Sequence, residues 1–333
     1  MSYPIRRILV AVKEPHGRTS PAIRKAAKLA RALGAQLELF HAISEPLAVD
    51  ALMFAGQGVK QMQAVRQARF LKRLEALARP LRRTGIDVRI AAEWDHPAHE
   101  ALVRRARRSG ADLIVAERHE SRHVAPWFLR YTDWELLRRS PVPVLLIKTS
   151  RPYGSLKVLS AVDPSHAFAK TARLDEEILR MAAGVSAAAK GKLHAVHAYV
   201  PTLMDISPAE LTAPDAPARI AGHARGVAST GLEKALRAVG LGKLPTAQRH
   251  LVAQHPVDAI PQLARQLRCD IVVMGALSRS GIKGLFIGNT AERLLDDLPC
   301  DLLIVKPPAF TGRVAAKSRG PLFAVLGPPQ GVI

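Results

Sequence analysis

The chain has 333 residues and a formal net charge of +21 at pH 7, and 48% of its residues are hydrophobic. A chain of this length and apolar content can bury two ordinary cores. Its two cysteines, Cys269 and Cys300, argue against a disulfide framework, and no apolar run is long enough to cross a membrane, so we expect a cytoplasmic protein.

Short Val/Ile/Leu-rich runs alternate with helix-length segments along the whole chain, which is typical of a parallel sheet covered on both faces. Segments such as Pro21–Leu33 and Val65–Ala78 have apolar residues three and four apart, as outer helices do. The predicted fold class is α/β, with two tandem doubly wound domains, each a five-stranded parallel sheet with helices on both faces. The predicted strands are Ile8–Val12, Gln36–Ala42, Asp87–Ala91, Asp112–Ala116 and Val144–Lys148, then Val158–Val162, Lys192–Val200, Gln248–Val252, Ile271–Met274 and Leu302–Lys306.

The sequence pattern occurs twice. Leu136–Lys148 aligns without a gap on Leu294–Lys306, and at the same offset Ala111–Ala116 falls on Cys269–Met274. We therefore predict one domain at residues 1–150 and a second at residues 151–308. Residues 309–333 are rich in Pro, Gly and basic residues without periodicity, and we expect them to form a disordered tail.

A glycine-bearing loop stands out in the second repeat. The strand Ile271–Met274 runs into Gly275-Ala-Leu-Ser278, and Gly288-Asn289-Thr290 follows after nine more residues. A buried strand, a glycine loop and a helix start in this order present backbone N–H groups that favour a phosphate.

These residues resemble the tandem-domain members of the universal stress protein family, the E-type proteins, over residues 5–308. In nucleotide-binding members the loop reads Gly-x-x-Gly, nine residues, then Gly-Ser or Gly-Thr, and an aspartate ends the first strand. The resemblance implies an ATP site, with Mg²⁺ if ATP is bound, in which Asp163 could hold the ion. It implies adenine contacts from Ala198 and Met274, and phosphate contacts from Gly275, Ser278, Gly288, Asn289 and Thr290.

Two positions depart from the family pattern. Ser278 replaces the second glycine and adds a Cβ, so the backbone cannot approach a phosphate as closely. Asn289 replaces the usual hydroxyl residue but can still donate hydrogen bonds, and Thr290 carries a hydroxyl one position later. An ATP site and a plain strand-to-helix turn both stay open at this point.

The first repeat lacks the motif. Gly275 falls on Glu117, Ser278 on Glu120, and Asp163 on Lys13, and the motif's later residues, Gly288 and Asn289, fall on Arg130 and Tyr131. Two carboxylates would repel a phosphate, so we expect this half to have a structural role. A different cleft could be lined by polar and aromatic residues, namely Trp94, His96, Glu117, His119, His123, Asp133 and Trp134.

Basic clusters, Arg104–Arg108 among them, fall within helical patterns, and we interpret them as solvated helix faces. Aromatic residues are not interleaved with them, so nucleic-acid binding beyond nonspecific electrostatics is not expected. His194 and His197 lie three apart on a strand and should point to opposite faces.

We find no catalytic constellation. The leading hypothesis is a cytoplasmic stress-response protein that binds a nucleotide or another small ligand in its second domain without dedicated catalysis. The alternatives are a binding protein for a less polar molecule, a slow ATPase, and a nucleic-acid-associated protein. Because single-domain relatives commonly pair through their fifth strands, we expect Val144–Lys148 to lie antiparallel to Leu302–Lys306 across a pseudo-twofold axis, in a mainly monomeric chain.

Overall fold

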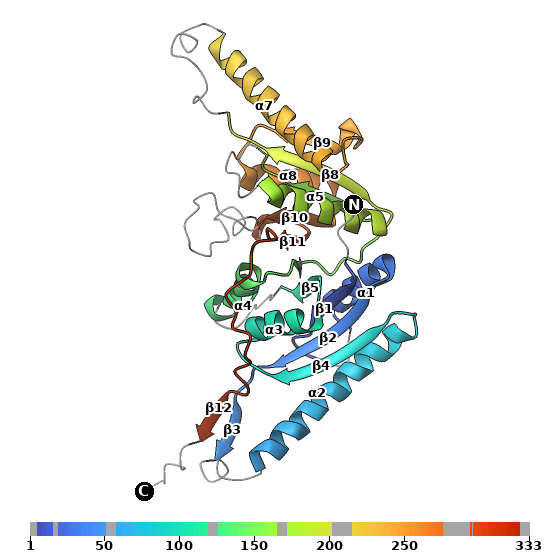
Figure 1. The fold of residues 1–333 in the computed structure, drawn as a ribbon, viewed down its shortest axis with the longest axis vertical. Coiled ribbons are helices and arrows are strands. Elements are labelled where there is room, and N and C mark those ends of the chain that lie inside the picture. Colours follow the sequence, from blue (N-terminus) through green and yellow to red (C-terminus); the bar gives the residue numbers. More distant parts are fainter. Residues whose placement is uncertain are drawn as a thin grey trace. The chain divides into compact units, whose positions relative to one another are not determined.

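A computed structural model describes residues 5–15, 19–50, 58–118, 126–164, 172–201, 215–275, 294 and 296–326. These residues form two compact units (Figure 1). The first unit comprises residues 5–144 together with residues 312–326, and the second unit comprises residues 145–311. No helix in the described part of the chain is long and apolar enough to cross a membrane.

The first unit is an α/β domain built on four parallel strands in the order β4-β2-β1-β5. The central strands are almost wholly buried, since Leu9, Leu37 and Leu113 have no exposed surface. Helix-start and helix-end signals fix α1, because Ser20 accepts a hydrogen bond from the Ile23 amide and Gly34 ends the helix at φ 64°. Its elements are β1 (Arg7–Ala11), α1 (Pro21–Leu33), β2 (Gln36–Ile43), β3 (Leu47–Asp50), α2 (Gly58–Arg82), β4 (Val88–Trp94), α3 (Ala98–Ser109), β5 (Leu113–Glu117) and α4 (Pro126–Arg139).

The second unit repeats this architecture with strands in the order β11-β10-β7-β8-β9, all parallel. Its first strand is β6 (Val144–Ile147), of which only Val144 belongs to the first unit, and β6 lies beside β11. The other elements are β7 (Lys157–Ala161), α5 (Ala172–Ala188), β8 (Lys192–Ala198), α7 (Ala216–Ala238), the 3₁₀ helix η3 (Thr246–Gln248), β9 (Arg249–Val252), α8 (Pro256–Leu267), β10 (Ile271–Gly275) and β11 (Asp301–Val305). The α/β fold class and all ten predicted strands are therefore confirmed, with small differences at their ends.

Asp301 organises the chain that follows β6. Its carboxylate has no exposed surface and accepts hydrogen bonds from the Lys148 amide at 2.9 Å and the Tyr153 hydroxyl at 2.6 Å. The residue after β6 thus meets the first residue of β11, and the two strands are neighbours in the sheet; their antiparallel direction stays a prediction.

The C-terminal extension differs from the expectation of disorder. Residues 312–326 are part of the first unit and end in β12 (Phe323–Leu326), which pairs in parallel with β3 (Figure 1). Neither strand is predicted from the sequence, because each is four residues long and its partner lies far away in the chain. Residues 327–333 lie outside the described part.

The β6–β11 pair predicts the behaviour of the chain in solution. We expect the intact chain to sediment mainly as a monomer, because each apolar strand already has a neighbour. Separated halves, residues 1–150 and 151–308, should dimerise or aggregate because each exposes one of these strands. Sedimentation velocity on all three proteins is the measurement, and soluble monomeric halves would contradict the prediction.

Candidate functional site

The carboxyl ends of three neighbouring strands meet at one edge of the second unit. Strand β7 lies between β10 and β8, with Val273 opposite Ser160 and Ala161 opposite Val196. This arrangement places Asp163, just after β7, at the same edge as Ala198 of β8 and Met274 and Gly275 of β10. Ligands of open α/β sheets bind at such an edge. The other predicted contacts lie outside the described residues, namely Ser278, Gly288, Asn289 and Thr290.

Asp163 is half-buried and is held at this edge by helix α5. Its backbone amide donates to a carboxylate oxygen of Asp175, in the first turn of α5, at 3.1 Å. Carboxylate oxygens are ligands that Mg²⁺ prefers, and a divalent cation would offset their repulsion of a phosphate. The two acidic residues at this edge therefore fit a magnesium-bound polyphosphate better than a free one.

Gly275 has a packing role that the sequence does not reveal. A Cβ at this position would lie 2.6 Å from Cδ2 of Leu174 and 3.3 Å from Cδ1 of Ile178. Both side chains belong to α5, so the glycine lets this helix pack against the end of β10. Packing against α5 therefore favours a glycine here whether or not a phosphate binds next to it, because a Cβ would force the Leu174 side chain to shift.

At the corresponding edge of the first unit, the charged groups are already satisfied by the protein. The Lys13 ammonium lies 3.3 Å from a carboxylate oxygen of Asp133, whose side chain is 8% exposed. Glu117, which ends β5, accepts a hydrogen bond at 3.4 Å from the amide of Ala22, in the first turn of α1. A carboxylate of the chain thus occupies a helix N-terminus, the kind of position where an anion binds.

The polar set proposed for a cleft in the first repeat is divided among several partners. The Trp94 indole donates to the Gln63 carbonyl at 3.2 Å, whereas His96 bonds to the Gly320 carbonyl. His119 and His123 lie outside the described residues, and Trp134 is half-buried in α4. Within the described ranges, no three His, Cys, Asp or Glu side chains are placed to hold a metal ion.

A buried histidine occupies the same place in both repeats. His41 follows the β2 residue opposite Ala11, and its Nδ1 lies 2.7 Å from the Val12 carbonyl. His197 follows the β8 residue opposite Ala161, and its Nδ1 lies 3.3 Å from the Val162 carbonyl. Each histidine thus fixes the backbone just before Lys13 or Asp163. This role is not predicted from the sequence, although the shared position of the two histidines in the repeats is a usable signal.

The opposite orientation expected for His194 and His197 is confirmed. His194 Nδ1 lies 3.1 Å from His250 Nε2 on the neighbouring strand, while His197 bonds to the Val162 carbonyl. Burial lowers the pKa of both His194 and His250. His194 and His250 are therefore neutral at pH 7, and their contact joins β8 to β9.

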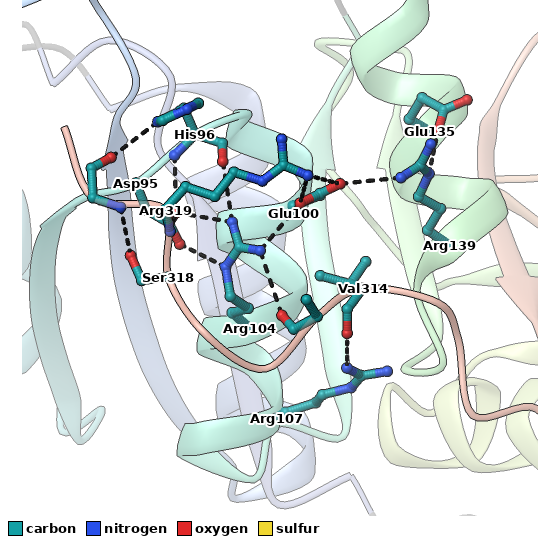
Figure 2. Close-up of polar contacts among 12 residues, drawn as sticks. Asp95, His96, Glu100, Arg104, Arg107, Glu135, Arg139, Val314, Ser318 and Arg319 are labelled. Carbon is teal, nitrogen blue, oxygen red and sulfur yellow. Dashed lines mark hydrogen bonds and ion pairs between the residues drawn. The ribbon is translucent and has the colours of Figure 1, made fainter. Parts of the chain in front are cut away.

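The arginine cluster of α3 is a solvated face only in part: Arg107 and Arg108 are exposed, as expected, whereas Arg104 is buried. Arg104 is 2% exposed and donates to both carboxylate oxygens of Asp95, at 2.7 and 2.8 Å (Figure 2). It also donates to Glu100 at 3.1 Å. Arg105 is half-buried and pairs with Glu38 and with Glu93. Charge repetition within a helix could not show which of these arginines would be covered.

The covering of Arg104 comes from the C-terminal extension. Arg107 donates to the Val314 carbonyl at 2.7 Å, and the amide of Arg319 donates to Asp95 at 2.9 Å (Figure 2). This site cannot be predicted from the sequence, because its two halves are more than 200 residues apart.

Comparison with known proteins accounts for the duplication. The model of the universal stress protein family matches residues 4–148 and 157–306. Universal stress protein E of Escherichia coli K12 is 28% identical over 310 residues, covering 91% of this chain and 94% of its own length. The corresponding protein of Photorhabdus laumondii is 26% identical over 308 residues, with 91% and 95% coverage.

Solved structures show the same tandem fold. A protein of unknown function from Pseudomonas aeruginosa PAO1 superimposes with a TM-score of 0.68 at 25% identity, covering 92% of this chain and 94% of its own. A universal stress protein from Archaeoglobus fulgidus gives a TM-score of 0.59 at 17% identity, covering 92% and 98%. The second likeness concerns the fold alone.

The buried pair of Asp95 and Arg104 predicts a large loss of stability when one partner is removed. Arg104→Met leaves the buried Asp95 carboxylate without its cation and removes one of three guanidinium groups from Glu100, so we expect the free energy of unfolding to fall by about 3–5 kcal/mol. Urea unfolding followed by circular dichroism measures the loss. The control is Arg66→Met, whose pair with Glu45 is exposed and should contribute under about 1 kcal/mol. Equal losses in the two variants would contradict the prediction.

His99 of α3 predicts a dependence of stability on pH. Burial, followed by the positive charge of Arg139, lowers the pKa of His99 to about 4. Because its unfolded pKa is about 6.5, the unfolded chain binds more protons between these values, and stability falls as pH falls. Between pH 7 and pH 5, the wild-type free energy of unfolding should fall about 2 kcal/mol further than that of His99→Gln. Parallel pH profiles would show that His99 is not buried in neutral form.

Proposed function

The chain belongs to the universal stress protein family, and we propose that its second unit binds an adenine nucleotide, as Mg·ATP, without dedicated catalysis. The observation that carries the proposal is the meeting of Asp163, Ala198, Met274 and Gly275 at one sheet edge, where the family-like glycine loop begins. Asp163 would hold the magnesium ion, and the loop with Ser278, Gly288, Asn289 and Thr290 would bind the phosphates.

The environment of this edge suits such a ligand. Met274 and Ala198 are each 8% exposed and offer the apolar contacts that an adenine ring requires. The net charge of +21 raises the local concentration of anions around the whole protein. The site would bind a nucleotide without hydrolysing it, because no described residue at this edge is arranged to activate water.

The first unit would not share this function. Its equivalent edge carries Glu117 bonded to the start of α1, and Lys13 paired with Asp133. A phosphate would have to displace a carboxylate that already accepts a backbone hydrogen bond. We propose that this half has a structural role.

The state of the two cysteines supports a cytoplasmic location. Cys269 and Cys300 are free and buried, and burial raises the pKa of each thiol to about 12. Both therefore stay protonated at neutral pH, where they act as small apolar side chains. This arrangement suits a reducing compartment.

Substitutions in the glycine loop test the nucleotide site. Gly288→Glu places a Cβ and a negative charge where a phosphate should lie, so Mg·ATP affinity measured by calorimetry should fall at least tenfold. Ser278→Gly should tighten binding by restoring the close backbone approach. The control is Gly222→Glu, which makes the same change on exposed helix α7, where an added Cβ meets no atom within 4 Å.

The outcomes separate the possibilities. A wild-type chain that does not bind ATP would contradict the proposed function. Unchanged affinity in a folded Gly288→Glu variant would place the ligand elsewhere, and the first unit would then have to be tested. Steady phosphate release under saturating Mg·ATP would show an ATPase instead of a binding protein.

A further inference from the structure

The C-terminal segment, defined as residues 312–326, follows helix α3 from its last turn to its first. Near the end of α3, Arg107 donates to the Val314 carbonyl at 2.7 Å. Near the start of α3, the Arg319 amide donates to Asp95 at 2.9 Å, and His96 Nδ1 lies 3.0 Å from the Gly320 carbonyl (Figure 2).

The first unit contacts this segment mainly through the segment's backbone. Beyond the contacts above, Arg104 donates to the Ala315 carbonyl at 3.4 Å and the Leu47 amide donates to the Leu322 carbonyl at 2.7 Å. The backbone pairing continues where Phe323 lies opposite Leu47 at the start of β12. Backbone groups are common to all peptides, so these contacts would hold any extended segment of suitable length.

Two positions give the contact its selectivity. The Arg319 guanidinium lies 3.0 Å from a carboxylate oxygen of Glu100, whose side chain is 5% exposed. Gly320 has φ 71°, a left-handed conformation that residues with a Cβ rarely adopt. The contact therefore uses an arginine side chain and, directly after it, a backbone turn that favours glycine.

The carboxylates that accept hydrogen bonds from the segment are buried and are held in place by other residues of the first unit. Asp95 is 1% exposed, and each of its carboxylate oxygens accepts a hydrogen bond from the Arg104 guanidinium. One of these oxygens also accepts a hydrogen bond from the backbone amide of Arg319 in the segment. Glu100 is fixed by Arg104 at 3.1 Å and by Arg139 at 3.0 Å, with Arg319 as its third guanidinium. These carboxylates remain in place for another basic segment because helices of the first unit hold them.

The segment itself is weakly anchored. Among residues 312–324, Val314 is the one buried hydrophobic side chain, whereas Leu322 is 39% exposed and Phe323 is 37% exposed. The Arg319 side chain is 53% exposed, so water weakens its pairing with Glu100. A segment with few buried apolar contacts opens more easily than the core of the unit.

We propose that Asp95, His96, Glu100, Arg104 and Arg107 form a peptide-docking surface that recognises an extended basic segment with an Arg-Gly pair. The C-terminal segment occupies this surface within its own chain and acts as a built-in competitor. When the segment is displaced, the surface binds an Arg-Gly segment of a partner protein. All the residues involved lie in the first unit, so the proposal does not depend on nucleotide binding.

The test uses the full chain with Arg319→Glu and Gly320→Val together. Both changes lie in the segment and leave the docking surface intact. Glutamate would face the Glu100 carboxylate, and valine would be strained at φ 71°. We expect trypsin to cleave after Lys317 at least tenfold faster than in the wild-type chain. The matched control is Arg225→Glu, a charge reversal on the exposed face of α7.

Binding in trans is then measured by fluorescence anisotropy with a labelled peptide of residues 312–326. The double variant with Arg319→Glu and Gly320→Val, called the released variant, should bind the peptide saturably. Its affinity should be at least tenfold higher than that of the wild-type chain, whose own segment competes with the peptide. A peptide with Arg319→Ala should lose at least tenfold in affinity. A peptide with Gly320→Ala should lose about fivefold, the cost of the left-handed conformation.

Each contrary result would overturn the proposal. Unchanged trypsin cleavage would show that these contacts do not hold the segment. A released variant that keeps the wild-type circular dichroism spectrum but does not bind the peptide would show that the surface is no docking site. Equal binding of a scrambled peptide would show nonspecific attraction only.

Discussion

The parallel sheet restricts the positions at which its strands can present charged or polar groups to a ligand. Both faces of the main sheet are covered, so strands such as β5 and β11 are apolar except at one end. Among the residues of the strands, the charged groups that could meet a ligand therefore lie at the strand ends and in the loops after them. Asp163, Gly275, Lys13 and Glu117 all lie at carboxyl ends of strands. The fold therefore offers one such edge in each unit before any particular residue is considered.

The two copies use that edge differently. In the second unit, the backbone amide of Asp163, after β7, donates a hydrogen bond to Asp175. The strands on either side of β7 end in small residues, Ala198 and Gly275. In the first unit, the glycine is replaced by Glu117, which accepts a hydrogen bond from the start of α1. Such a carboxylate stabilises the helix start and closes it to external anions. The two units thus differ at this edge, because in the first unit an internal contact of Glu117 lies where the second unit has Gly275.

The sequence predicted the ten main strands because a buried parallel strand is a local apolar run. It could not predict β3 and β12, since Leu47 and Phe323 pair across most of the chain. It placed Asp163 and Gly275 at one edge through the resemblance to a family, but the packing of Leu174 on Gly275 depends on the position of a helix. Arg104 was misread for the same reason. Helical periodicity places side chains around an axis, whereas burial depends on what later covers that side.

The C-terminal segment shows why composition alone can mislead. Its Pro, Gly and basic residues cannot form a core, and a chain of this kind stays disordered unless another surface orders it. The first unit supplies that surface, with Asp95 accepting an amide and His96 meeting a carbonyl of the segment. The features that suggested disorder are then the ones that permit docking. Gly320 adopts a left-handed turn, and Arg319 reaches a buried carboxylate. The order of this segment is therefore a property of the surface beneath it as much as of its own sequence.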